Sequence, residues 1–422
     1  MAGPEVRPYN GGGIEGRAGE LEPRPFENTI VALDVDGVLV RPNAYRLAVG
    51  LTINFFAEQL GVDPKPFLVD DKYNAPGRNM SHFEAEGIYD PWDVSAIIVS
   101  LMKLKKADID VSNGEALEAF RTNSNSQRHP PEVILEWIIK QYPQVPIRAM
   151  QDIEKTLFQT RDPFKNEATS VFQEYVLGRE TFEEIYGRPS RTGAEESLIR
   201  TKDQSLIDGD GRRELEKISQ GGGMVVIYTG RPGSPPHDTR RRPADGYAPE
   251  AELAVEKSKV NALGIVSMGS MEWLGRRTRT SVEKLTKPNP TQALATILAG
   301  IRGRVDAQVL LDAYEWGRTG KAPVEVQPFI GNKTKLRLVV VEDSPSGVRA
   351  FINARKILEG EGVSVELTAI GVHDVSLEKH LAFSRLGADA GIDTIDTNAG
   401  IREGIIRYSF KTQQESLGVE GL

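Results

Sequence analysis

Two carboxylates two residues apart, Asp34 and Asp36, directly follow an apolar run at residues 31–33 and precede a glycine. Such a run is typical of a strand buried in a parallel sheet. Both acids would then lie at the carboxyl end of that strand, where open α/β folds bind ligands. Acids crowded there are destabilising unless a cation or a reacting group neutralises them. Taken alone, the motif fits a strand followed by an Asp-Gly turn equally well.

Three later segments carry polar residues that suit the same chemistry. Two of them close apolar runs at residues 224–228 and 338–341, and the third precedes a helix-like pattern at residues 291–300. In chain order the polar residues are Thr229, Gly230, Arg231, Lys287, Glu342 and Asp343. Phosphoryl transfer needs a nucleophile, an acid–base group, cations and hydrogen-bond donors for the phosphate oxygens. The four segments together predict that chemistry.

In these motifs the chain resembles the haloacid dehalogenase-like superfamily, in its phosphatase and phosphomutase branch. The motifs are Asp-x-Asp-Gly from Asp34, Thr-Gly-Arg-Pro from Thr229, Lys-Pro-x-Pro from Lys287 and Glu-Asp-Ser-Pro-Ser-Gly from Glu342. The last looks most like the β-phosphoglucomutase-type subgroup. The resemblance covers residues 28–41 and 206–398, and over the segment between them it is only architectural.

The resemblance implies a role for each motif residue. Asp34 would be the nucleophile that forms an aspartyl-phosphate, and Asp36 would protonate the leaving oxygen and later activate water. Thr229 and the backbone N–H of Gly230 would hold a phosphoryl oxygen. Lys287 would neutralise the nucleophile and the phosphoryl oxygens.

A divalent cation, Mg²⁺, is implied as the cofactor because a carboxylate that attacks an anionic phosphate meets like charge. The resemblance places the ion on a carboxylate oxygen of Asp34, the backbone carbonyl of Asp36 and the carboxylate of Asp343. Glu342 would bind it directly or through water.

Some of these roles have alternatives. Lys284 could replace Lys287, although only Lys287 is followed by the Pro-x-Pro of the family pattern. Arg231 would bind the substrate phosphate or pair with a carboxylate of the inserted domain. Ser344 and Ser346 are better explained as caps of the following helix than as reacting groups.

Nearly two hundred residues separate the first predicted strand from the next. Apolar residues at helical spacing predict helices at residues 44–60, 94–104, 131–142, 153–158 and 172–186. A crossover between parallel strands needs only a dozen or so residues. The excess therefore predicts an inserted helical domain, which resembles an enlarged type 1 cap of the superfamily.

The predicted fold is of the α/β class: a Rossmann-like parallel sheet with a large helical insertion. We expect a flexible tail at residues 1–25, a core of residues 26–41 plus 206–400, a cap at residues 42–205 and a C-terminal tail or helix at residues 401–422. Within the core, periodicity predicts a helix over residues 250–263.

Composition narrows the function classes. The 422 residues include 52 basic and 60 acidic side chains, for a net charge of −8, and no cysteine. An acidic chain disfavours non-specific nucleic-acid binding, and the lack of cysteine excludes disulfides and thiolate chemistry. No apolar stretch reaches the roughly 20 residues of a membrane span, and no signal peptide opens the chain. We expect a cytoplasmic protein that binds neither nucleic acid nor membrane, with its oligomeric state open.

The function predicted from the sequence is a Mg²⁺-dependent phosphatase that hydrolyses a small phosphorylated metabolite through an aspartyl-phosphate. A phosphomutase of the β-phosphoglucomutase type is the first alternative, since it uses the same intermediate. A non-catalytic phosphometabolite-binding protein is the second. The enlarged cap is expected to exclude macromolecules and to select a small phosphate ester.

Overall fold

A computed structural model gives the conformation of most of the chain. It describes residues 26–67, 80, 82–83, 86, 88, 90–123, 129–239, 245, 247–331, 334–373, 377–387 and 392–396. The tails predicted at residues 1–25 and 401–422 lie outside the described residues. No helix within the described ranges is both long and apolar enough to cross a membrane.

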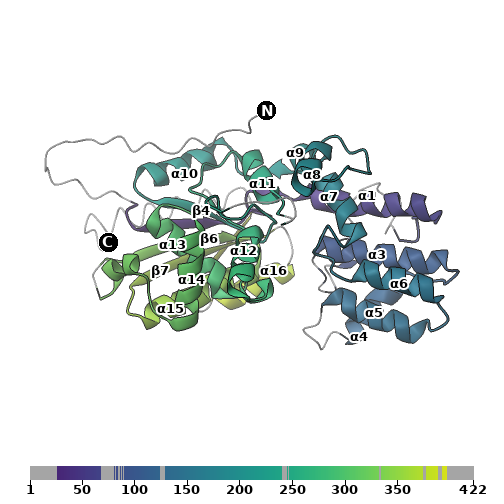
Figure 1. The fold of residues 1–422 in the computed structure, drawn as a ribbon. Coiled ribbons are helices and arrows are strands. Elements are labelled where there is room, and N and C mark those ends of the chain that lie inside the picture. Colours follow the sequence, from purple (N-terminus) through teal and green to yellow (C-terminus); the bar gives the residue numbers. More distant parts are fainter. Residues whose placement is uncertain are drawn as a thin grey trace.

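The chain forms a parallel sheet with helices on both faces, which confirms the predicted α/β class (Figure 1). The strand order is β5-β4-β1-β6-β7-β8. The strands are β1 (Thr29–Leu33), β4 (Met224–Tyr228), β5 (Ile265–Val266), β6 (Leu336–Glu342), β7 (Val365–His373) and β8 (Ile392–Asp396). Because β1 pairs in parallel with β4 and with β6, the residues that follow these three strands meet at one edge of the sheet.

All five residues of β1 are buried. Successive side chains of a strand point to opposite faces of the sheet, and both faces are covered here. Ile30 and Ala32 belong to one hydrophobic cluster, and Val31 and Leu33 belong to another on the opposite face. The first face packs against α13 (Pro290–Arg302), α14 (Ala307–Thr319) and α15 (Pro345–Gly360), and the second against α10 (Gly209–Gln220) and α11 (Glu250–Ser258). Burial on both faces is why the strand is a continuous apolar run rather than an alternating one.

The sheet and the helices that pack on it form one body, which we call the sheet body. Four further helical segments of the described residues belong to it. They are α12 (Met268–Thr278), η2 (Val282–Lys284), η3 (Val324–Phe329) and α16 (Leu377–Gly387). Neither β5 nor α12 was predicted: β5 has only two residues, too few for a periodic pattern, and α12 begins directly after it at a Ser267 cap.

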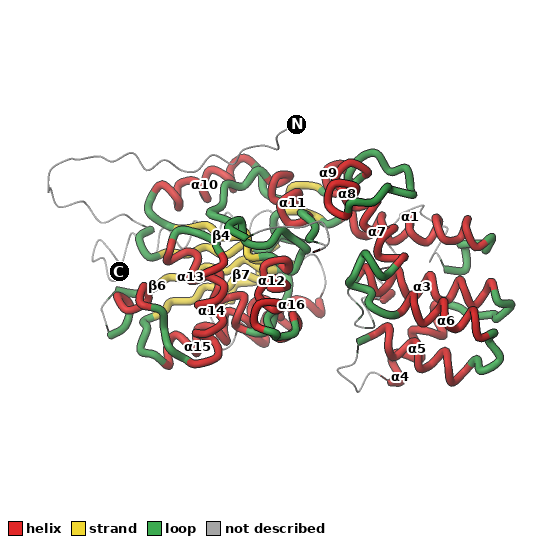
Figure 2. The backbone as a smooth tube through the Cα atoms, in the orientation of Figure 1, coloured by secondary structure: helices red, strands yellow, loops and turns green. Residues whose placement is uncertain are grey.

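A separate helical body lies beside the sheet, within the predicted insertion (Figure 2). Its helices are α1 (Asn43–Leu60), α3 (Pro91–Lys106), α4 (Asn113–Asn123), α5 (Pro130–Gln141), α6 (Ile147–Leu157), α7 (Glu167–Leu177), α8 (Arg179–Tyr186) and α9 (Leu198–Lys202). α3 is buried at every position from Asp93 to Leu104, so it is the central helix around which the others pack.

The two connections between the bodies form a short antiparallel ribbon. β2 (Val40–Arg41) leads into the helical body and β3 (Gln204–Ser205) leads out of it, with Val40 opposite Ser205 and Arg41 opposite Gln204. We call this pair the linker ribbon. The chain thus enters and leaves the helical body at adjacent positions.

Two predicted helices differ from the structure: one is interrupted, and the other ends early. The pattern at residues 172–186 is divided between α7 and α8 at Gly178, where φ is +75°. A side chain there would meet the backbone of Glu196 and Ser197 at 2.7 and 2.6 Å, so the close approach of a distant segment fixes the break. α11 ends at Ser258, because Lys259 takes the left-handed conformation that terminates helices.

Candidate active site

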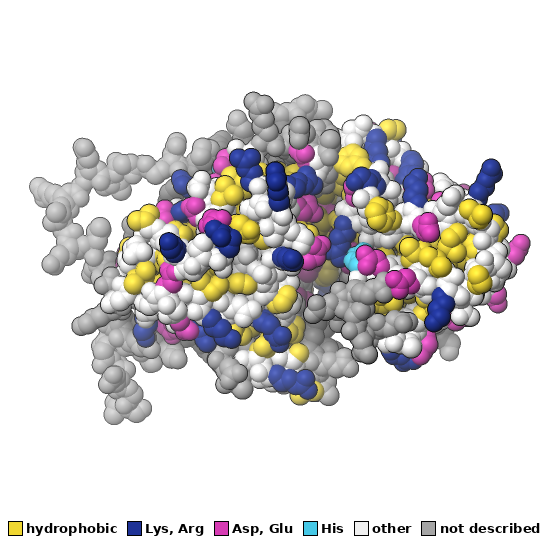
Figure 3. Space-filling model, turned by 60° about the horizontal axis from the view of Figure 1, so that its bottom comes forward, with side chains coloured by type: hydrophobic (Ala, Val, Ile, Leu, Met, Phe, Trp, Pro, Cys, Tyr) yellow, Lys and Arg dark blue, Asp and Glu magenta, His cyan; other side chains and the backbone are white. Residues whose placement is uncertain are grey.

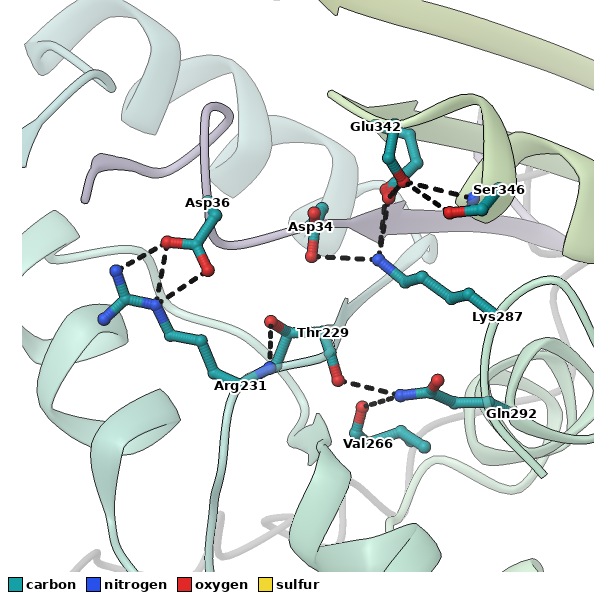
Figure 4. A network of polar contacts seen from close by, with 11 residues as sticks. Asp34, Asp36, Thr229, Arg231, Val266, Lys287, Gln292, Glu342 and Ser346 are labelled. Carbon is teal, nitrogen blue, oxygen red and sulfur yellow. Dashed lines mark hydrogen bonds and ion pairs between the residues drawn. The ribbon is translucent and has the colours of Figure 1, made fainter. Parts of the chain in front are cut away.

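The centre of the candidate site is a buried ion-pair cluster at the carboxyl ends of β1 and β6 (Figure 4). Asp34 follows β1, and its backbone N–H donates to the carbonyl of Val341 at 3.0 Å. Lys287 reaches in from the segment before α13, so that its Nζ lies 3.1 Å from Asp34 Oδ1. The same Nζ donates to both carboxylate oxygens of Glu342, at 2.7 and 3.1 Å.

Charge explains why Lys287 is held there. Burial alone would lower the pKa of Lys287, but the adjacent Asp34 and Glu342 outweigh it and raise that pKa above its ordinary value. Burial, and then repulsion from Asp34, raise the pKa of the fully buried Glu342 well above its ordinary value. The ammonium also lies 4.3 Å from the centre of the Tyr228 ring. Lys287 is therefore a fixed cation against Asp34.

The acidic residues of the cluster also fit a divalent metal ion. Asp34, Glu342 and Asp343 each offer a carboxylate oxygen, and these oxygens lie within 4.8 Å of one another. Oδ1 of Asp34 is buried, and the Lys287 ammonium at 3.1 Å is the charge that faces it among the described residues. Three carboxyl groups gathered in one place offer oxygen donors alone, and donors of this kind suit a hard cation such as Mg²⁺.

Two glycines make room for these acids. Gly37 has a φ of +71°, and a side chain there would come within 2.7 Å of Asp343. A side chain on Gly347, in the first turn of α15, would come within 2.1 Å of Glu342 Oε1. The absence of side chains at both positions therefore permits the carboxylates to gather.

Thr229 and Gly230 form a second part of the site, at the end of β4. Thr229 is fully buried, and its Oγ1 accepts the backbone N–H of Arg231 at 3.1 Å. Gln292 fixes this turn, because its Nε2 donates to the carbonyls of Thr229 at 2.8 Å and Val266 at 3.0 Å. Gly230 is exposed, with open space where a side chain would be. The turn thus leaves room beside Thr229 for a ligand oxygen.

Arg231 is buried and points to Asp36 (Figure 4). Its Nε lies 2.9 and 3.0 Å from the two carboxylate oxygens of Asp36, and its Nη2 lies 2.6 Å from one of them. Nη2 also donates to Asp203 at 3.0 Å. Of the two partners expected for Arg231, the structure shows a carboxylate of the predicted insertion, because Asp203 lies within residues 42–205.

The other residues considered for the site differ in whether they contact the cluster. Lys284 is exposed on η2, whereas Lys287 joins the cluster. Ser344 caps α15, as predicted, by accepting the N–H of Gly347, and its hydroxyl also donates to Glu342 at 2.8 Å. Asp203 and Gln292 were not predicted. Gln292 could have been found from its position just after the Lys-Pro-Asn-Pro motif, whereas Asp203 carries no local signal.

A cavity of about 150 Å³ lies between the helical body and the sheet body. It opens beside Pro232 and Gly233, which directly follow Arg231. Its lining includes Trp92, Arg161 and Phe164 from the helical body, and Glu272 and Arg276 from α12. Figure 3 shows a hollow between the two bodies with charged side chains along its walls. The lining reaches Pro232 and Gly233 but includes none of Asp34, Thr229 and Lys287.

Comparisons with known proteins bear on the fold alone. No family model matches the chain, and no curated protein matches it. A crystal structure of a Northeast Structural Genomics Consortium target, ZR25, is similar with a TM-score of 0.55 at 16% identity, over 90% of this chain and 99% of that one. The crystal structure of a hydrolase from Pseudomonas syringae aligns over 90% of this chain and 98% of that one, with 12% identity and a TM-score of 0.30. At such identities the first shows a shared overall fold, and the second carries no argument.

Proposed function

We propose that the protein is a Mg²⁺-dependent phosphatase that hydrolyses a small phosphate monoester through an aspartyl-phosphate on Asp34. One observation carries the proposal above the others. The buried carboxylate of Asp34 lies 3.1 Å from the largely buried ammonium of Lys287, and it offers an oxygen within 4.8 Å of those of Glu342 and Asp343. That combination supplies a nucleophile, a cation for the phosphate and donors for a metal ion.

In the first half of the reaction, an oxygen of Asp34 attacks phosphorus while the bond from phosphorus to the ester oxygen breaks. Lys287 stabilises the negative charge on the phosphoryl oxygens, and the Thr229 turn donates hydrogen bonds to them. The ester oxygen leaves with a proton from Asp36. Mg²⁺ bound by Asp34, Asp343 and Glu342 would supply the positive charge that offsets repulsion between carboxylate and phosphate.

In the second half, a water oxygen attacks phosphorus and the bond to Asp34 breaks, which returns Asp34 as a carboxylate. The water gives one proton to Asp36, and inorganic phosphate leaves. Each aspartate therefore ends the cycle as it began.

The cavity between the two bodies supports a small substrate. At about 150 Å³, the cavity has room for a small group and excludes a folded protein. Arg161 and Arg276 share its walls with Asp162, Asp245 and Glu272, so the lining suits a leaving group with hydroxyl substituents, and Trp92 offers an apolar surface to its carbon skeleton.

The test is release of phosphate from p-nitrophenyl phosphate and from a panel of phosphorylated metabolites, with Mg²⁺ and with EDTA. We expect turnover with Mg²⁺, loss with EDTA and recovery when Mg²⁺ is returned. Asp34→Asn should lower turnover by at least about 10³-fold with an unchanged circular dichroism spectrum, since it removes the nucleophile. Asp110→Asn, at an exposed carboxylate of the helical body, is the matched control. Hydrolysis that persists in Asp34→Asn would refute the nucleophile assignment.

A further inference from the structure

Arg231 lies at a junction of three parts of the molecule. It extends from the turn after β4 to Asp36, which follows the nucleophile, and to Asp203, which directly precedes β3 of the linker ribbon. Its guanidinium also lies 4.6 Å from the centre of the Tyr45 ring on α1. We call Arg231, Asp36, Asp203 and Tyr45 the arginine junction.

The junction fixes both connections to the helical body. Asp203 accepts the backbone N–H of Ala44 through Oδ1 at 2.8 Å while its Oδ2 accepts from Arg231. Ala44 lies in the first turn of α1, just after the entering strand of the ribbon, and Asp203 lies just before the leaving strand. One side chain on the sheet body therefore holds the entry and the exit of the helical body.

Burial argues against Arg231 as a ligand of the substrate phosphate. The side chains of Arg231 and Asp203 are both 0% exposed, whereas that of Asp36 is 30% exposed. Nε and Nη2 are already bound to carboxylates, and Nη1 is buried. A phosphate arriving from solvent therefore meets Asp36 before it meets the guanidinium.

We propose, on the basis of the proposed function, that Arg231 is a positioning residue for the hydrolytic half of the reaction. It fixes the orientation of the Asp36 carboxylate and joins it to both connections of the helical body. A planar guanidinium binding through two nitrogens restricts the rotation of a carboxylate far more than a single ammonium contact does.

The step that depends on this orientation is the attack of water on the aspartyl-phosphate. The water oxygen forms a bond to phosphorus, the bond from phosphorus to Asp34 breaks, and Asp36 takes the water proton. With p-nitrophenyl phosphate the first half needs little help from an acid, because nitrophenolate is a good leaving group. Loss of orientation should therefore slow the second half selectively with this substrate.

The experiment is rapid-quench kinetics with p-nitrophenyl phosphate and Mg²⁺ on Arg231→Gln and on the unaltered protein. We expect the steady-state rate of Arg231→Gln to fall about 10- to 100-fold, a part of the 10²- to 10⁴-fold that acid–base catalysis supplies. The first turnover should slow by less than about threefold. A burst of nitrophenolate close to one equivalent and accumulation of acid-stable phosphoprotein should then appear.

Further variants keep the test decisive. Arg231→Lys retains the charge without the planar fork and Asp203→Asn removes one anchor, so both should show the burst with a smaller loss of steady-state rate. Hydrogen exchange of the metal-free variants should be faster around Ala44 and β3. Arg302→Gln is the control, because Arg302 is 9% exposed and paired with Asp312 and Glu325 away from the site; it should show neither change.

Equal slowing of the first turnover and of the steady state would overturn the inference, since a phosphate ligand or a purely structural role has that effect. An unchanged steady-state rate in Arg231→Gln would overturn it as well. If the unaltered protein fails to hydrolyse phosphate esters, the proposed function itself falls, and this result is distinguishable from both.

Discussion

At the scale of residues, the site has two cations with different partners, the largely buried Lys287 and the fully buried Arg231. Lys287 faces Asp34, the proposed nucleophile, and Glu342, whereas Arg231 faces Asp36 and Asp203 beside the linker ribbon. An ammonium is a compact point charge and suits a position where charge must be neutralised, whereas a guanidinium suits a position where a carboxylate must be oriented. The chain uses each cation for the task that matches its shape.

Removal of Lys287 should lower the stability of the folded protein, because Lys287 offsets the repulsion between the neighbouring acids. Lys287→Met leaves Asp34 and Glu342 buried without their cation, and breaking a buried pair in this way typically costs about 3–5 kcal/mol. We expect urea unfolding to show a lower free energy of unfolding for Lys287→Met than for the unaltered protein. Addition of Mg²⁺ should raise that free energy by more in Lys287→Met than in the unaltered protein.

The double variant Lys287→Met with Glu342→Gln is the matched control. It removes one acid together with the cation, so it should recover part of the lost stability. A double variant that is no more stable than Lys287→Met would contradict an electrostatic origin of the loss.

At the scale of elements, the start of α15 is fitted to the buried acid. A methyl group at position 347 would lie 2.1 Å from Glu342 Oε1. Gly347→Ala must therefore displace Glu342, and overpacking of this kind typically costs about 1–3 kcal/mol. We expect a lower midpoint of urea unfolding together with reduced phosphatase activity.

The same helix supplies the control for that prediction. Gly360, the last residue of α15, has open space where a side chain would lie. Gly360→Ala should be neutral or stabilising by up to about 1 kcal/mol, because alanine is the better helix former. Equal destabilisation by both substitutions would show that the fit at position 347 is unimportant.

The sequence predicted elements best where the information is local. The acid pair after β1 and the acids at the end of β6 could be located because each pair directly follows its own apolar run. The break at Gly178 could not, since its cause is contact with Glu196 and Ser197. Asp203 was missed for the same reason: its partner Arg231 is distant in sequence, and only the path of the linker ribbon brings them together.

At the scale of the whole molecule, Glu250 connects the two bodies. It begins α11 on the sheet body, and its carboxylate accepts from Tyr45 Oη on α1 and, at 2.7 Å, from Gln173 Nε2 on α7. The side chain belongs to a residue only 1% exposed, and burial is the main cause that raises the pKa of Glu250 from 4.5 to about 7. The contact between the bodies should therefore respond to pH.

The direction of that response follows from the raised pKa. As pH rises from about 4.5 to about 7, the unfolded chain releases the Glu250 proton before the folded protein does, so the stability contributed by this residue falls across that window. The loss amounts to at most about 3 kcal/mol. Glu250→Gln should abolish this part of the pH dependence, so that its stability relative to the unaltered protein is greater at pH 8 than at pH 5.

Urea unfolding at pH 5, 6, 7 and 8 measures the effect. Glu256→Gln, at an exposed position of the same helix, should change stability equally at every pH. A constant difference between Glu250→Gln and the unaltered protein over this range would contradict the prediction.

The linker ribbon allows the segment between its two strands to change during evolution. Since Val40 lies opposite Ser205, the two ends of the intervening segment are neighbours, and closing it adds no long loop to the sheet body. A segment joined in this way can be lengthened, shortened or replaced during evolution while the strand order stays intact. A different helical body could then bring recognition of a different compound, while the residues at the ends of β1, β4 and β6 stay the same.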